Sequence, residues 1–235
     1  MSDIIDQCGQ ALDAGGEVGL VNSVFSLIPP RNRYGIEFGA RGQGPTWPLR
    51  QQHGWQTLLM DSGPDIHPPI HKECVTRENV NELFQRYQVP HEYDFLCIDI
   101  DGNDYWVWKA IDEARFYATV VCIEYNCHFP ADVAVSVKYN PKSIYRNNRY
   151  YGASASAMER LARIKGYSLI CVEGFMNLWF ARDDRLPVSV RHRPLEDMFH
   201  YPLDVAALAR QHGLPLPSWF QAPPPDLNAE QWQLV

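Results

Sequence analysis

The chain has 235 residues, of which 46% are hydrophobic, and a formal net charge of −7. This length suits one domain with a sizeable core, and a negative charge without a lysine or arginine run argues against binding to nucleic acid. No stretch approaches the roughly 20 apolar residues that span a bilayer, and the N-terminus does not resemble a signal peptide. We therefore expect a cytoplasmic protein that does not bind membranes and acts on a small molecule.

The first part of the chain alternates helical and strand patterns. Residues 1–30 predict a helical cap, which is interrupted at Gly15 and Gly16. The pattern then predicts a strand, a short helix and a second strand, over 34–39, 46–53 and 55–61. A strand, a helix and a strand in this order imply parallel pairing in one sheet.

The middle of the chain continues this alternation. A Pro-rich loop over 62–71 precedes an expected short strand near Cys74 and Val75. Apolar periodicity predicts three helices, over 78–88 with Thr76 as its cap, from about 104, and over 154–165. Apolar runs predict further strands, which begin at Tyr93, Thr119, Tyr167 and Asn177. The last two are expected to form an antiparallel hairpin.

The C-terminal part has a different composition. Prolines recur beyond Arg185, with a short helix predicted over 203–212. Trp219, Phe220 and Trp232 suggest that this extension docks on the domain or on a second copy of the chain, which makes a homodimer one expected assembly. We therefore divide the chain into a cap, an α/β domain and an extension, over 1–30, 31–185 and 186–235.

The six cysteines fall mainly on or beside predicted strands and not at the spacing of a disulfide framework, so we expect reduced thiols. Cys122, Cys127 and His128 are an alternative zinc set. That reading is disfavoured because the sequence has no pair of cysteines separated by two intervening residues and Cys122 lies inside a predicted strand.

Two apolar strands end in acidic residues. The strand from Tyr93 leads into Asp99, Asp101 and Asp104, and the strand from Thr119 ends at Glu124. Neighbouring carboxylates repel one another and resist desolvation, so they are best tolerated where water, a cation or a cationic ligand compensates them. If the two strands are adjacent, their acidic ends predict a ligand crevice in an α/β sheet.

A glycine loop follows the first strand. Glu37 and Gly39 begin the run Glu-Phe-Gly-Ala-Arg-Gly-Gln-Gly, whose spacing differs from the dinucleotide fingerprint. Glu37 would repel a pyrophosphate, so NAD fits poorly, whereas the ammonium end of S-adenosylmethionine fits well. Asp61 ends the second strand and is placed to accept both ribose hydroxyls. The alternative is that both acids are solvated loop residues.

The chain resembles the class I S-adenosylmethionine-dependent methyltransferases, and the FkbM-like group most closely. The resemblance lies in four stretches, Ile36–Ala40, Asp99–Asp104, Ile123–Asn126, and Tyr151–Ser154 continuing through Gly166–Tyr167. It implies a Rossmann-like α/β fold with a seven-stranded, mostly parallel sheet whose last strand is antiparallel, and methyl transfer, often to a hydroxyl oxygen. One departure is that Arg41 and Gln43 occupy later glycine positions of the family loop.

Together with the strand-end logic, the resemblance gives a candidate site. The expected cofactor residues are Glu37, Gly39, Ala40, Asp61, Val75, Thr76 and Asp99. The expected ligands of Mg²⁺ or a similar ion, which would lower the pKa of a substrate hydroxyl, are Asp99, Asp101, Glu124 and Asn126. Asp99, Asp101 and His128 are the candidate catalytic residues, with Asp101 or His128 as a general base. A cap on the following helix is the structural alternative for Asp101 or Asp104.

The expected function is therefore methylation of a small hydroxylated or amino-bearing metabolite. Tyrosines and arginines in 129–151 are expected to form a substrate wall or, alternatively, a packed loop. Three other functions stay open: another reaction of S-adenosylmethionine such as an intramolecular displacement, a metal-dependent nucleotide-sugar glycosyltransferase using Asp99 and Asp101, and a non-catalytic binding module.

Overall fold

The computed structural model describes residues 4–42, 44–142, 148–174, 176–198 and 230–235. Its α-helices are α1 (Ile4–Leu27), α2 (Thr46–His53), α3 (Val80–Arg86), α4 (Asp104–Ala110) and α5 (Ala155–Lys165). Its strands are β1 (Tyr34–Phe38), β2 (Gln56–Asp61), β3 (Ile70–Lys72), β4 (Glu92–Ile98), β5 (Tyr117–Glu124), β6 (Val135–Val137), β7 (Tyr167–Glu173), β8 (Asn177–Arg182) and β9 (Trp232–Leu234). Among the described residues, no helix is long and apolar enough to cross a membrane.

Seven strands form one sheet in the order β3-β2-β1-β4-β5-β8-β7. Pairing is parallel from β3 to β5, and β8 runs antiparallel to both of its neighbours, β5 and β7. The expected Rossmann-like, mostly parallel sheet with an antiparallel last strand is therefore confirmed. The strand order reverses between β1 and β4, and ligands of α/β sheets bind beyond the carboxyl ends of the strands at such a point.

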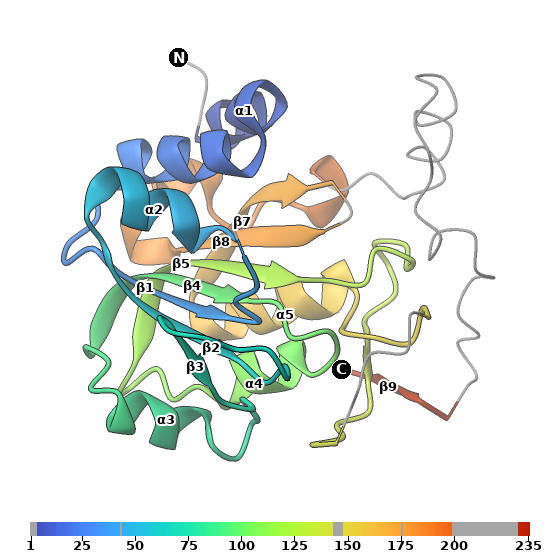
Figure 1. The fold of residues 1–235 in the computed structure, drawn as a ribbon. Coiled ribbons are helices and arrows are strands. Elements are labelled where there is room, and N and C mark those ends of the chain that lie inside the picture. Colours follow the sequence, from blue (N-terminus) through green and yellow to red (C-terminus); the bar gives the residue numbers. More distant parts are fainter. Residues whose placement is uncertain (1–3, 43, 143–147, 175, 199–229) are drawn as a thin grey trace, which may run out of the picture.

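Helices cover both faces of the sheet (Figure 1). α1 and α2 lie on one face, and α3, α4 and α5 lie on the other. Side chains of a strand point alternately to the two faces: Leu96 and Ile98 of β4 join the core with α3 to α5, whereas Phe95 and Cys97 join the core with α1 and α2. Burial on both faces explains why the central strands are almost continuously apolar in sequence.

The N-terminal segment α1 consists of two helical parts that meet at a kink. The chain bends at Gly16, whose φ of 58° lies in the left-handed region, at the point where the sequence predicted an interruption. The second half of α1 packs on the sheet through Leu20, Val21 and Val24, which are all buried. The kink fixes the direction of Glu17, the residue that follows it.

Three elements differ from the expectation. The expected strand near Cys74 and Val75 is wrong, because β3 lies earlier, at the end of the Pro-rich loop. β3 is a short, mainly exposed edge strand set by its pairing with β2, so it carries no apolar run. α3 begins at Val80 and not at Glu78, since the Thr76 hydroxyl accepts the backbone N–H of Asn79 and closes a turn before the helix. β6 lies within a segment that was expected to be irregular.

The last described residues return to the domain. β9 pairs antiparallel with β6, and Trp232 packs edge-on against Phe129 with 4.8 Å between ring centroids. Trp232 is buried there. The predicted helix over 203–212, and Trp219 and Phe220, lie outside the described residues. All six cysteines are free thiols.

Candidate functional site

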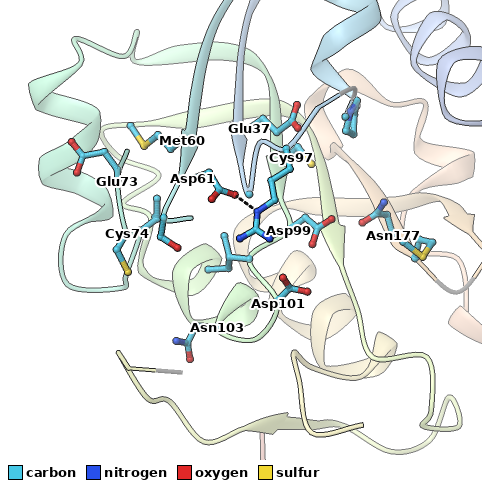
Figure 2. A pocket seen from close by; sticks show the side chains of 18 of the residues that line it. Glu37, Met60, Asp61, Glu73, Cys74, Cys97, Asp99, Asp101, Asn103 and Asn177 are labelled. Atoms are coloured by element: carbon cyan, nitrogen blue, oxygen red, sulfur yellow. Dashed lines mark hydrogen bonds and ion pairs between the residues drawn. The ribbon is translucent and has the colours of Figure 1, made fainter. Parts of the chain in front are cut away.

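A cavity of about 420 Å³ lies beyond the carboxyl ends of β1, β2 and β4 (Figure 2). Its wall contains most of the cofactor residues expected from the sequence, namely Glu37, Gly39, Asp61, Val75 and Asp99, together with Asp101. Of the described residues that form the wall, seven are acidic and only Arg41 is basic. The cavity therefore favours a cationic ligand over a phosphate.

Gly39 is required by the close approach of two strand ends. Its φ is +81°, and a Cβ atom there would lie 1.6 Å from the carbonyl oxygen of Asp99. The N–H groups of Gly39 and Ala40 both donate to the carbonyl of Met60, at 2.9 and 3.1 Å. Ala40 is buried and does not belong to the cavity wall, so the structure gives it a packing role.

Glu37 organises the loop between β1 and α2. Its side chain is buried, and Oε2 accepts both the backbone N–H of Thr46, at 3.1 Å, and the Thr46 hydroxyl. Thr46 is the first residue of α2, whose cap position Pro45 provides no side-chain hydrogen bond. Glu37 therefore satisfies the start of this helix from a neighbouring strand. Burial raises the pKa of Glu37, and the two bonds from Thr46 oppose that rise.

Asp61 is already engaged. Arg41 Nε donates to Asp61 Oδ2 at 2.9 Å, and the Gly63 N–H donates to Oδ1. Asp61 is almost fully buried, whereas 67% of the Arg41 side chain is exposed. Asp61, the expected acceptor of ribose hydroxyls, therefore lies in the cavity under a solvent-exposed arginine. That arginine, Arg41, occupies a loop position where the family pattern has glycine.

Val75 and Thr76 lie differently. Val75 is buried in the cavity wall. Thr76 is not part of the wall, and it exchanges hydrogen bonds with Asn79 before α3. Its role is structural in this conformation.

Asp99, Asp101 and Glu124 form an acidic cluster. One carboxylate oxygen from each lies within 4.8 Å of the others. The pKa of Asp99 is raised to about 7, mainly by burial and then by the negative charges of Asp104 and Asp101. Burial is also the main reason that the pKa of Glu124 lies well above its usual value. Glu124 Oε2 is buried without a hydrogen-bond partner among the described residues. Three hard oxygens at this spacing fit a divalent cation with ligand distances of about 2.0–2.6 Å.

Asp104 holds the backbone that presents this cluster. It is fully buried, and its two oxygens accept the N–H groups of Ile100 and Gly102 at 2.8 and 2.9 Å. Burial raises its pKa to about 6 against the effect of these bonds. Asp101 stands in the turn so formed with a φ of 57°. Asp104 therefore stabilises the turn before α4.

Asn126 and His128 do not belong to the cavity wall. Asn126 Nδ2 donates to the carbonyls of Arg149 and Tyr151, both at 2.9 Å, and its Oδ1 accepts the N–H of His128. His128 is buried, and its pKa is lowered to about 4, mainly by burial and then by the positive charge of Arg149. Asn126 thus anchors the following loop, and neither a ligand role for it nor a base role for His128 is supported by this geometry.

The tyrosines of the expected substrate wall that the structure describes do not line the cavity. Tyr139 lies at the surface, where its hydroxyl donates to Glu78 and its ring stacks under Arg77 at 3.8 Å. Tyr150 and Tyr151 are not part of the cavity wall, and Tyr145 and Arg146 lie outside the described residues. Pro141 and Asn103 are the residues that border the cavity on this side.

The polar wall residues that sequence reasoning missed include Glu17, Glu173 and Asn177. Glu173 ends β7, so the rule that identified Glu124 could have found it. Glu17 carries no such signal because it enters the site through the kink in α1. Asn177 starts β8 and pairs in register with Glu124.

A comparison with protein-family models found no match to this chain, and a comparison with curated proteins found none either. The family resemblance therefore rests on the quoted motifs and stays a prediction.

Proposed function

We propose that this chain is an S-adenosylmethionine-dependent methyltransferase of a small hydroxylated or amino-bearing metabolite, with transfer to oxygen favoured. The observation that carries the proposal is the acidic cavity at the carboxyl ends of β1, β2 and β4. Its position is where α/β sheets bind nucleosides, and its charge favours a sulfonium and disfavours a pyrophosphate. The motif resemblance and the reversed β8 support the same family.

Each expected role has a residue in this geometry. Asp61 is the ribose acceptor, Val75 borders the adenine, and Glu37 with Gly39 shapes the loop around the amino-acid end of the cofactor. The cofactor supplies an electrophilic methyl group on its sulfonium. The chain must then orient the acceptor atom and take up its proton, and Asp99 and Asp101 lie in the wall where an acceptor would sit.

The acidic cluster offers two ways to activate a hydroxyl. A divalent cation held by Asp99, Asp101 and Glu124 would lower the pKa of a bound hydroxyl. Asp101, the most exposed of the three, would alternatively accept the proton itself. Asn126 is not needed in either arrangement.

The glycosyltransferase alternative is less well supported. Asp99 and Asp101 do converge, but a nucleotide sugar needs cations for its diphosphate. Among the described residues of the wall, Arg41 alone is basic, and it is paired with Asp61. A non-catalytic binding module would have the same cavity but would not turn over a substrate.

Calorimetric titration of the full chain with S-adenosylmethionine, S-adenosylhomocysteine, NAD and UDP, each with and without Mg²⁺, tests the proposal. Binding of the first two alone is the expected result. Metal-dependent binding of UDP without the sulfonium cofactor would replace the proposal by the glycosyltransferase, and silence from all four would favour a binding module.

The Asp101→Asn variant separates the two activation mechanisms. Either role predicts a fall in turnover of about a hundredfold or more. Only the ligand role also predicts weaker binding of Mn²⁺, measured by electron paramagnetic resonance. Asp65→Asn, an exposed change of equal charge, is the control. Unchanged turnover in a folded Asp101→Asn protein would remove this carboxylate from the mechanism.

A further inference from the structure

One end of the cavity is lined by polar residues to which the proposed function assigns no role. Glu17 comes from α1, Glu173 from the end of β7 and Asn177 from the start of β8. Figure 2 shows Asn177 on the opposite side of Asp99 from Asp61. This end therefore lies away from the expected ribose position, on the side of β5 and β8.

The negative charge at this end is not balanced by a basic residue of the wall. Arg41, the one basic residue among the described residues there, hydrogen-bonds to Asp61 at the other end. Burial, and then the charges of Glu173, Glu37 and Asp99, raises the pKa of Glu17 to about 8. Such a shift shows how poorly the free cavity solvates a further negative charge here.

Asn177 provides an independent indication of a ligand. Only 6% of this residue is exposed, and its Nδ2 donates to Glu173 Oε2 at 3.2 Å. That bond fixes the orientation of the carboxamide, because the flipped arrangement would place two oxygens together. Its Oδ1 has no hydrogen-bond partner among the described residues, although buried acceptors in folded proteins are nearly always satisfied.

We infer that Glu17, Glu173 and Asn177 form a subsite for an aliphatic ammonium group of the substrate, so that the metabolite carries both a hydroxyl and a primary amine. This inference rests on the proposed function. An ammonium group has three N–H donors and no acceptor, which matches two carboxylates and one carbonyl oxygen. Its positive charge compensates both acids at once.

The same chemistry argues against two other occupants. A divalent cation needs several hard oxygens that converge, and the acidic set that does so among the described residues is Asp99, Asp101 and Glu124. A methyl-accepting amine must lose its proton before it attacks, whereas two carboxylates stabilise the protonated form. The ammonium group is therefore a recognition group, and the hydroxyl is the acceptor of the methyl group.

The test is binding of ethanolamine to the full chain saturated with S-adenosylhomocysteine, measured by ligand-observed NMR or calorimetry. Ethylene glycol is the matched probe without an ammonium group. We expect weak but saturable binding of ethanolamine and none of ethylene glycol. Glu17→Gln and Glu173→Gln should each weaken ethanolamine binding by about tenfold, the usual scale of a charge-assisted hydrogen bond. The control is Glu196→Gln, an exposed acid outside the cavity wall.

The outcomes separate this inference from the proposed function. If the chain binds S-adenosylhomocysteine but does not bind ethanolamine, the subsite is overturned and the proposed function is not. Glutamine variants that weaken S-adenosylhomocysteine itself would assign these acids to the cofactor, and so would also overturn the subsite. Ethanolamine binding that depends on Glu17 in a chain that does not bind S-adenosylhomocysteine would support the subsite and contradict the methyltransferase. If Glu173→Gln fails to fold because Trp179 loses its acceptor, Glu17→Gln decides.

Discussion

Arg41 is the residue that most distinguishes this site from the glycine loop it resembles. A guanidinium beside a buried carboxylate stabilises that carboxylate, but it also occupies acceptor positions that a ribose would use. Most of the Arg41 side chain is in solvent, so it can swing away at little cost. We therefore regard the pair as a competitor of the nucleoside and not as a barrier to it.

This competition gives a prediction at the scale of single residues. Adenosine, which lacks the amino-acid group, should bind more tightly to Arg41→Ala by a few-fold, because Asp61 gains free acceptor positions. Asp61→Asn should bind adenosine about tenfold or more weakly, since hydrogen bonds to a charged group contribute roughly 1.5–3 kcal/mol. Calorimetry on both variants measures this.

Asp65→Asn, an exposed acid between β2 and β3, controls for the change in charge. If Arg41→Ala weakened adenosine binding, the arginine would be part of the nucleoside site and not its competitor. If Asp61→Asn left binding unchanged, the ribose assignment would be wrong.

At the scale of elements, hydrogen bonds within the protein hold the carboxyl end of β1 in place. Asp99 N–H donates to the carbonyl of Phe38 at 3.1 Å, which ties the residue after β4 to β1. Glu37 then connects β1 to the start of α2. The glycine loop therefore has a structural requirement independent of any cofactor.

Two glycines in this loop allow a matched experiment. Gly39 and Gly42 have similar φ values of +81° and +78°, but a Cβ at Gly42 meets nothing within 4 Å. Gly42→Ala should cost only the backbone strain of about 1–2 kcal/mol. Gly39→Ala adds a collision with the Asp99 carbonyl and should lose about 4 kcal/mol or more, measured by chemical denaturation. Equal losses in the two variants would contradict the close approach of β1 and β4.

For the whole molecule, the elements that the sequence predicted are those whose formation depends on a local pattern of residues. The central strands are read correctly because both faces are buried, which leaves long apolar runs ended by Asp99 and Glu124. The helix predicted over 154–165 is α5, whose ends are set by local interactions: the Ser154 side chain accepts the N–H of Ala157, and Gly166 adopts the left-handed conformation. The confirmed sheet followed from these elements together with the family resemblance.

What the sequence did not predict depends on contacts between distant segments. β3 and β6 are three-residue strands that exist through pairing with β2 and β9. The Arg41–Asp61 pair joins the loop after β1 to the end of β2. Asn126, which was predicted to belong to the site, instead donates its side-chain hydrogen bonds to the carbonyls of Arg149 and Tyr151. Glu17 reaches the cavity only because α1 kinks and packs across the sheet. No local spacing encodes these placements.

Glu17 also makes the stability of the whole fold depend on pH. Because burial and nearby acids raise its pKa to about 8 in the folded state, against about 4.3 in the unfolded chain, the native protein holds a proton that the unfolded chain releases. This contribution to stability is present in full below about pH 4, falls as the pH rises, and is lost above about pH 8. Glu17→Gln mimics the protonated form and escapes the loss. With allowance for its partial exposure, we expect it to stabilise the free protein by roughly 1–3 kcal/mol at pH 8.5 relative to the original chain.

Denaturation at pH 5 and pH 8.5 measures this difference, with Glu196→Gln as an exposed control. The advantage of Glu17→Gln should shrink at pH 5, because this pH lies less than about one unit above the pKa of the unfolded carboxyl and little of the stability has yet been lost. An advantage that stayed constant with pH would mean that Glu17 is solvated in the free protein. With an ammonium ligand bound in this subsite, the original chain should be more stable than Glu17→Gln at pH 8.5. The ligand stabilises the ionised Glu17 carboxylate and interacts less favourably with the neutral glutamine.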